Sequence, residues 1–99
     1  MFVVRDIFYC KPGHVRPMVE KMRAMAGHAH KLGMGSMRVM TDVSAERFWT
    51  VVSEIEVESI ERFAEMSRKA AEMPEFQETM KGYHDLVDHG RREIYTLEA

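Results

Sequence analysis

His84 and Asp88 form the pattern in this 99-residue chain that most resembles a catalytic pair. Because they lie four residues apart in a predicted helix, both side chains would share one face. The carboxylate could then orient the imidazole as a general base. The alternative is structural, since a histidine near the C-terminal end of a helix is favoured by the helix dipole. His89 repeats the spacing with Asp85, so both interpretations remain open.

The remaining histidines and the single cysteine do not predict a metal site. His28 and His30 lie two positions apart in a predicted helix, so their side chains point about 200° apart. His14 falls in a turn, and no His-x-x-x-His or Cys/His spacing accompanies it. Cys10 precedes Lys11, which could activate the thiol as a nucleophile, although a structural thiol is the simpler interpretation. We therefore expect no metal and no cofactor.

Aromatic side chains are candidates for the walls of a ligand pocket. Large rings offer a small molecule much contact area at little cost in conformational entropy. Packing in the core or in a dimer interface is their alternative role. The candidate ligand-binding residues are Phe8, Tyr9, Trp49, Phe63, Tyr83 and, as a polar contact, Arg38.

Charged residues interrupt the apolar sequence of the predicted strands. Charges that are buried there must be paired. Arg38 and Glu54 fall in two strands joined by a short connection, so they could pair with each other. Together with Arg5 and Asp6, they could instead hold a polar group of a ligand.

Periodicity assigns these residues to strands and helices. Apolar residues recur every three or four positions after Pro12-Gly13, which predicts a first helix. Ser59 can cap a second helix, and Pro74 separates it from a third. The predicted order is strand 2–10, helix 14–31, strand 34–41, strand 47–57, helix 60–72, helix 74–87 and strand 92–97.

This order predicts a single α+β domain over residues 1–99 with the ferredoxin-like split βαβ arrangement. Its four-stranded antiparallel sheet would carry the helices on one face. Strands 2–10 and 47–57 are nevertheless apolar on both faces, and such strands need cover on both. A second copy of the chain is the simplest cover, so we expect a homodimer that closes an α/β barrel.

Composition argues against several classes of partner. The formal net charge of −2 provides no basic field for nucleic acid. No apolar run approaches the roughly 20 residues of a membrane span, and charged Arg5 and Asp6 follow the start too closely for a signal peptide. A single cysteine provides no disulfide framework. We therefore expect a cytoplasmic protein with no nucleic-acid partner and no membrane association.

Methionine is abundant, with ten residues in the chain. The thioether side chain is flexible and polarizable, so it fills irregular gaps in a core. The same property suits an adaptable apolar pocket or interface, and both roles remain open.

Several segments resemble the dimeric α/β-barrel superfamily, which includes antibiotic-biosynthesis-monooxygenase-like and NIPSNAP-like proteins. The resemblance covers nearly the whole chain and concerns the fold more than any chemistry. It is carried by Lys11-Pro12-Gly13-His14-Val15 after the first strand, by 47–54, by Pro74-Glu75-Phe76, and by 90–95, which is similar to a NIPSNAP-type ending.

This resemblance implies a homodimer whose two sheets face each other. For some members it also implies haem degradation or a cofactor-independent oxidation of aromatic substrates. The chain contains no asparagine, so the asparagine, tryptophan and histidine set of the haem-degrading members is incomplete. Ile55 stands where many monooxygenase-like members have an aromatic residue, and Phe63 stands near the expected position of a family histidine.

We therefore expect a small homodimeric barrel protein that binds a small, largely apolar or aromatic ligand. One form of this function is a cofactor-independent, monooxygenase-like enzyme with His84 as its base. The alternative is a non-catalytic, NIPSNAP-like assembly or binding protein. The sequence leaves open whether the protein is an enzyme.

Overall fold

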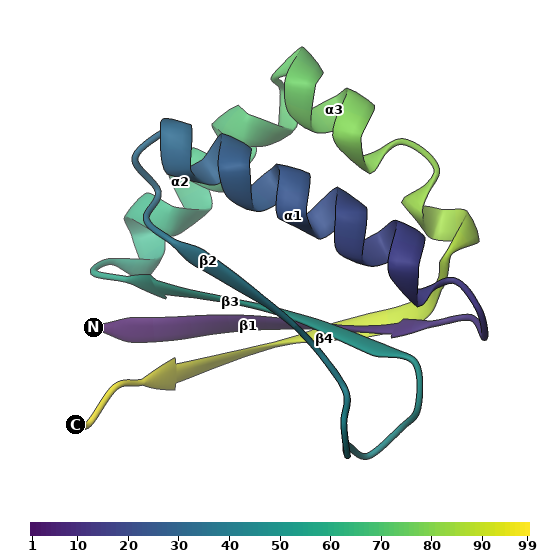
Figure 1. Cartoon of the computed structure of the whole chain (residues 1–99). Helices are drawn as coiled ribbons and strands as arrows, with labels where there is room; N and C mark the ends of the chain where they lie inside the picture. The colour runs from purple at the N-terminus through teal and green to yellow at the C-terminus, as the bar shows by residue number, and fades with distance from the viewer.

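One antiparallel sheet carries all the helices of the chain on a single face (Figure 1). The computed structural model describes all 99 residues. Its elements are β1 (Phe2–Cys10), α1 (Val15–Lys31), β2 (Met37–Thr41), β3 (Thr50–Val57), α2 (Ile60–Ala71), α3 (Pro74–Met80), the short 3-10 helix η1 (Tyr83–Asp85) and β4 (Val87–Thr96).

The strands are ordered β2-β3-β1-β4, and every neighbouring pair is antiparallel. Helix α1 connects β1 to β2, whereas α2 and α3 connect β3 to β4. This is the ferredoxin-like α+β arrangement that the sequence predicts. The pairing of β1 with β4 contains one irregularity, between Tyr9 and Cys10, where the register shifts.

The side chains of β1 alternate between the helix-covered face and an open face of the sheet. On the covered face, Cys10 packs with Met18 and Met22 of α1 and with Val51 of β3. Val4 belongs to a second buried cluster on the same face, toward the opposite end of the strand. The core therefore lies between the sheet and the helices.

Helix α1 forms because its apolar residues make one stripe, and Met18 and Met22 of that stripe are buried. Helix α2 begins at the predicted cap, where the Ser59 hydroxyl accepts a hydrogen bond from the Arg62 backbone N–H at 3.2 Å. Pro74 occupies the first turn of α3, where its missing N–H costs least.

Strand β3 begins at Thr50, whereas the sequence pattern predicts a start at residue 47. Asp42 provides the reason, because its carboxylate accepts the Thr50 backbone N–H at 2.9 Å and closes the loop 42–49. Phe48, predicted as a strand residue, is 84% exposed in this loop, and Trp49 has a φ of +64°. The loop extends away from the helices in Figure 1.

The third predicted helix ends early, at Met80, instead of continuing to residue 87. Lys21 satisfies the backbone carbonyls at this end, because its Nζ donates to Thr79 O at 3.1 Å and to Lys81 O at 2.7 Å. Gly82 follows with a φ of +82°, a conformation that ends helical geometry. Strand β4 therefore begins at Val87, five residues before the predicted start at residue 92.

Gly90 is the one strand position where a side chain cannot be accommodated without movement of the backbone. It pairs with Phe8, and a Cβ atom built there would lie 2.8 Å from the Ile7 carbonyl oxygen. We expect Gly90→Ala to lower the free energy of unfolding by about 1–3 kcal/mol. Urea denaturation followed by circular dichroism measures this change.

Gly27 provides the matched control. It lies inside α1, and a Cβ atom there meets nothing within 4 Å. Gly27→Ala should therefore raise the free energy of unfolding, by about 0.5–1 kcal/mol, because alanine is the better helix former. A Gly90→Ala protein as stable as the unmodified chain would contradict the close approach of β1 and β4.

Candidate functional site

A polar row crosses the helix-covered face of the sheet. Asp6 in β1 pairs in register with Ser53 on one side and with Arg92 on the other. One edge of the Arg92 guanidinium group holds the Asp6 carboxylate. Nε donates to Oδ1 at 2.6 Å, and Nη2 donates to Oδ2 at 3.0 Å. Such a bidentate pair fixes the orientation of both side chains.

A cavity of about 360 Å³ lies above this row, between the sheet and the helices. Asp6, Ser53 and Arg92 are part of its wall, and 11 of its 16 lining residues are hydrophobic. The methionines and phenylalanines in the wall are Met22, Met25, Met34, Met37, Met80, Phe8, Phe63 and Phe76. The cavity is thus mostly apolar, with a polar row on the sheet side and two uncharged polar residues, Ser67 and Gln77, on the helix side.

Contacts between the helices and the sheet position the cavity walls. The Arg92 guanidinium carbon lies 5.5 Å from the ring centroid of Phe63 in α2. Phe76 in α3 packs on the His28 ring of α1, with centroids 5.3 Å apart. His28 Nε2 also lies 3.1 Å from the Thr79 hydroxyl, which joins α1 to α3. The hydrogen bonds to Asp6 raise the pKa of Arg92 against the opposing effect of burial, so this arginine is ionised.

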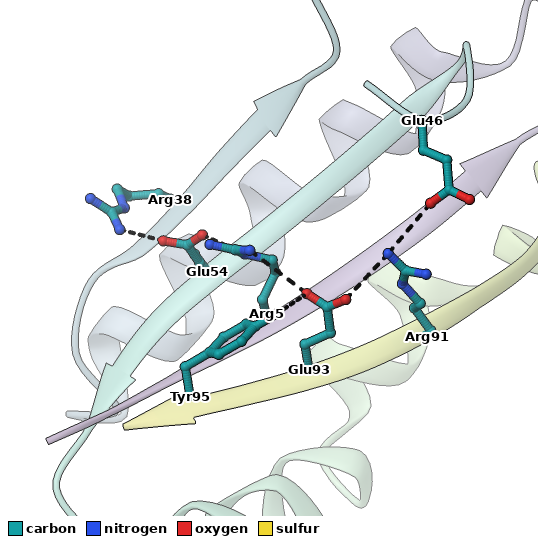
Figure 2. Close-up of polar contacts among 7 residues, drawn as sticks. All are labelled: Arg5, Arg38, Glu46, Glu54, Arg91, Glu93 and Tyr95. Carbon is teal, nitrogen blue, oxygen red and sulfur yellow. Dashed lines mark hydrogen bonds and ion pairs between the residues drawn. The ribbon is translucent and has the colours of Figure 1, made fainter. Parts of the chain in front are cut away.

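The open face of the sheet carries a different set of charges (Figure 2). Glu54 accepts a hydrogen bond from Arg5 Nε at 2.8 Å and another from Arg38 Nη2. Glu93 extends this network of ion pairs. Its Oε1 lies 3.7 Å from Arg5 Nη1, and its Oε2 lies 3.2 Å from Arg91 Nη2. The pairing of Arg38 with Glu54, predicted from the sequence, is confirmed.

Glu54 is the most buried acid of this network, with 8% of its surface exposed. Burial raises the pKa of Glu54, but the hydrogen bonds and charges of Arg5 and Arg38 outweigh it, so the pKa lies below its ordinary value. Glu54 is therefore ionised near neutral pH and fixed between two cations.

A second hollow, of about 470 Å³, lies between the open face and the loop 42–49. Only 6 of its 16 lining residues are hydrophobic, and its central charges, those of Arg5, Glu54 and Glu93, are already paired with one another. The cavity on the helix side offers more apolar contact, so it is the better candidate for a ligand site.

The predicted ligand-binding residues separate into two groups. Phe8 and Phe63 line the apolar cavity, and Tyr83 packs against the main core cluster beside it. Trp49 lies in the loop 42–49, 44% exposed, and Arg38 lies on the open face. Tyr9 also lies on the open face, buried beneath Arg47, whose guanidinium carbon is 4.7 Å from its ring centroid.

The geometry expected for His84 and Asp88 does not form. The predicted helix that would have contained both residues stops at Met80. His84 therefore lies in η1, and Asp88 lies in β4. Both side chains are exposed, and neither lines the apolar cavity. His84 instead packs on the Tyr83 ring, with centroids 4.0 Å apart.

Cys10 does not have the character of a nucleophile. It is 5% exposed, and burial is the main effect that raises the pKa of its thiol, followed by the charges of Asp42 and Asp88. These effects oppose the alternative of a thiol activated by Lys11 and agree with the structural interpretation that the sequence favours.

The structure contains no group of three or more His, Cys, Asp or Glu side chains arranged to hold a metal ion. None of its helices combines the length and the apolar character needed to cross a membrane.

Sequence reasoning missed the polar row as a unit. Asp6 shares a face with Val4 and Phe8 in the alternating pattern of β1, so an acid on an apolar face was visible in the sequence. Arg92 had no such signal, because its partner depends on the register between the first and last strands of the chain.

The pKa of Glu54 predicts an acid-dependent loss of stability. Because the folded-state pKa lies below the unfolded value of about 4.3, the unfolded chain binds more protons as the pH falls. The contribution of Glu54 is present above that value and is lost as the pH falls through the folded-state pKa. Glu54→Gln should lower the free energy of unfolding by about 1–3 kcal/mol at neutral pH. The free energy of unfolding of this variant should also fall less steeply as the pH is lowered.

Urea denaturation at a series of pH values from about 3 to about 7 measures this effect. Glu56→Gln is the matched control, because Glu56 lies in the same strand and is exposed. If the free energies of unfolding of the two variants fall equally as the pH is lowered, the role of the Arg5–Glu54–Arg38 pairing is contradicted.

No family model and no curated protein matches the chain. Solved structures do, and one is an uncharacterized NIPSNAP-like domain protein from Burkholderia xenovorans, with a TM-score of 0.82 and 18% identity over 99% of this chain and 85% of that one. A NIPSNAP family protein from Agrobacterium tumefaciens gives a TM-score of 0.82 and 18% identity over 98% of this chain and 86% of that one.

A putative antibiotic biosynthesis monooxygenase from Nitrosomonas europaea gives a TM-score of 0.75 and 14% identity over 100% of both chains. At these identities the likeness concerns the fold and does not transfer an activity. The chain therefore has the fold that NIPSNAP-like and antibiotic-biosynthesis-monooxygenase-like structures share, as its sequence resemblance predicts.

Proposed function

We propose that the protein binds a small, largely apolar molecule in the cavity between the sheet and the helices. The observation that carries this proposal is the cavity of about 360 Å³ with 11 hydrophobic residues among its 16 lining residues. Ligand sites in proteins are typically about 300–1,000 Å³, mostly apolar, and contain a few placed polar groups. The Ser53, Asp6 and Arg92 row supplies those polar groups.

The methionines of the wall support binding over simple core packing. Five of them surround the cavity without filling it. Their flexible thioethers can adapt to ligands of different shape, which would account for part of the high methionine content.

The same geometry favours binding over catalysis. No histidine lines the cavity, and the one carboxylate there, Asp6, accepts hydrogen bonds from Arg92 at both oxygens. The ion pair with Arg92 thus holds this carboxylate in a fixed orientation. A cofactor-independent, monooxygenase-like oxidation is the second candidate, and the likeness of fold to the Nitrosomonas europaea protein favours it.

We also propose that two copies assemble through their open sheet faces. No helix covers this face, which combines the paired charges of Figure 2 with partly exposed apolar side chains. Met40 is 39% exposed there, and Tyr95 is 49% exposed. A stable dimer of this kind would bury at least about 1,000 Å² in total.

The single buried thiol of Cys10 suits a reducing compartment, so we propose that the protein is located in the cytoplasm.

Filling the cavity should abolish ligand binding. Ala71 lines the cavity at its α2 wall, so Ala71→Leu would occupy part of the space. A bound two-ring aromatic such as 2-methylnaphthalene at ten times its Kd should stabilise the unmodified protein by about 1.4 kcal/mol, and this rise in Tm should disappear in Ala71→Leu. Thermal denaturation with and without the probe measures both.

Ala24→Leu is the matched control, because Ala24 is an exposed helical alanine outside the cavity. This variant should keep the full rise in Tm. Equal loss in both variants, or no rise in the unmodified protein with any two-ring aromatic, would refute the binding proposal.

A charge on the open face should separate the proposed dimer. Met40→Lys places a cation within the proposed interface, whereas Leu32→Lys changes a residue of similar exposure, 37%, at the end of α1. Sedimentation at micromolar concentration should give dimers for Leu32→Lys and single chains for Met40→Lys. Single chains for the unmodified protein would refute the assembly.

A further inference from the structure

The cavity contains a pair of opposite charges and no other charged side chain. Of its 16 lining residues, only Asp6 and Arg92 are ionic. The two charges are joined by two hydrogen bonds and cancel, so the net charge of the wall is zero. An anionic ligand group beside Asp6 would meet a like charge, and a cationic group beside Arg92 would do the same.

Both members of the pair keep unused hydrogen-bonding capacity. Arg92 has five N–H donors and directs two of them to Asp6. Each Asp6 oxygen accepts one of these bonds and has a further lone pair. The pair can therefore donate one hydrogen bond and accept another at neighbouring atoms, with the Ser53 hydroxyl beside them in the same row.

The position of the pair leaves it open to a ligand. The Asp6 side chain is 24% exposed and the Arg92 side chain is 51% exposed. On the sheet side, the lining residues are the polar Asp6, Ser53 and Arg92 together with the apolar Phe8 and Met37. The other polar lining residues, Ser67 and Gln77, lie on the helix side and are uncharged.

We propose that the cavity selects an uncharged, mostly apolar molecule with one group that both donates and accepts a hydrogen bond, such as a hydroxyl or a primary amide. The Asp6–Arg92 pair recognises this group and discriminates against carboxylates. This inference rests on the proposed function, since it names the ligand class of the same cavity.

Three probes that differ only in a one-carbon substituent test the selection: 2-methylnaphthalene, 2-naphthylmethanol and 2-naphthoate. Their affinities are measured by titration calorimetry at neutral pH and low salt. The unmodified protein should bind the alcohol about tenfold more tightly than either the methyl compound or the carboxylate, because only the alcohol gains hydrogen bonds without a charge conflict.

Asp6→Asn should remove the discrimination against the carboxylate. Removal of the negative charge leaves Arg92 with an unbalanced cation, so 2-naphthoate should bind about tenfold more tightly than it does to the unmodified protein. The double variant Asp6→Asn/Arg92→Gln is uncharged again and should lose this gain. Asp85→Asn changes the net charge equally but lies in η1, outside the cavity, and should change none of the affinities.

The outcomes distinguish ligand binding by the cavity from ligand selection by the charge pair. If all three probes bind the unmodified protein equally, the cavity binds ligands but the charge pair does not select them, and this inference is wrong. If no probe binds, the proposed function is wrong. If Asp6→Asn and Asp85→Asn change the affinity for 2-naphthoate equally, the effect is one of overall charge and the inference is also wrong. Circular dichroism confirms that each variant keeps its fold.

Discussion

Strand β1 is hydrogen-bonded along both of its edges, and its register determines what each face of the sheet presents. With Asp6 opposite both Ser53 and Arg92, the even-numbered side chains of β1 face the helices and the odd-numbered ones face away. Because the period is two, consecutive residues serve different purposes. Asp6 belongs to the cavity wall, whereas Arg5 belongs to the charge network of the open face. One strand thus contributes side chains to both the cavity wall and the charge network of the open face.

The two faces of the sheet arrange their charged side chains in different ways. On the open face, Glu54 is held by two arginines and the network continues through Glu93, so the charges are shared among several partners. On the helix-covered face, Asp6 and Arg92 form an isolated pair among apolar side chains. An isolated ion pair whose side chains are 24% and 51% exposed contributes little net stability. The proposed ligand selection rests on this pair.

The fold could be predicted because its signals are local. The bounds of β1 agree with the sequence pattern, and α1 differs from it by one residue at its start. The errors lie where a distant contact decides the conformation. Lys21 of α1 donates to a backbone carbonyl at the end of α3, and Asp42 closes the loop before β3. Neither contact can be predicted from the local sequence of the helix or strand whose boundary it sets. The candidate site divides in the same way. Phe8 and Phe63 follow from apolar periodicity, whereas the position of Arg92 depends on pairing between the two ends of the chain.

Strand β4 is an edge strand, so only its pairing with β1 sets its alignment. Arg91 faces the open side and Arg92 faces the cavity, although the two residues are neighbours. The pairing of Asp6 with Arg92 and of Ile7 with Arg91 places the two arginines on opposite faces. Loss of a single residue in the turn before β4, with the rest of the pairing kept, would exchange the two faces of the strand and place Glu93 on the helix-covered side in place of Arg92. The length of this turn should therefore matter more than the identity of its residues, because a shift of one position would change the charges that both faces present.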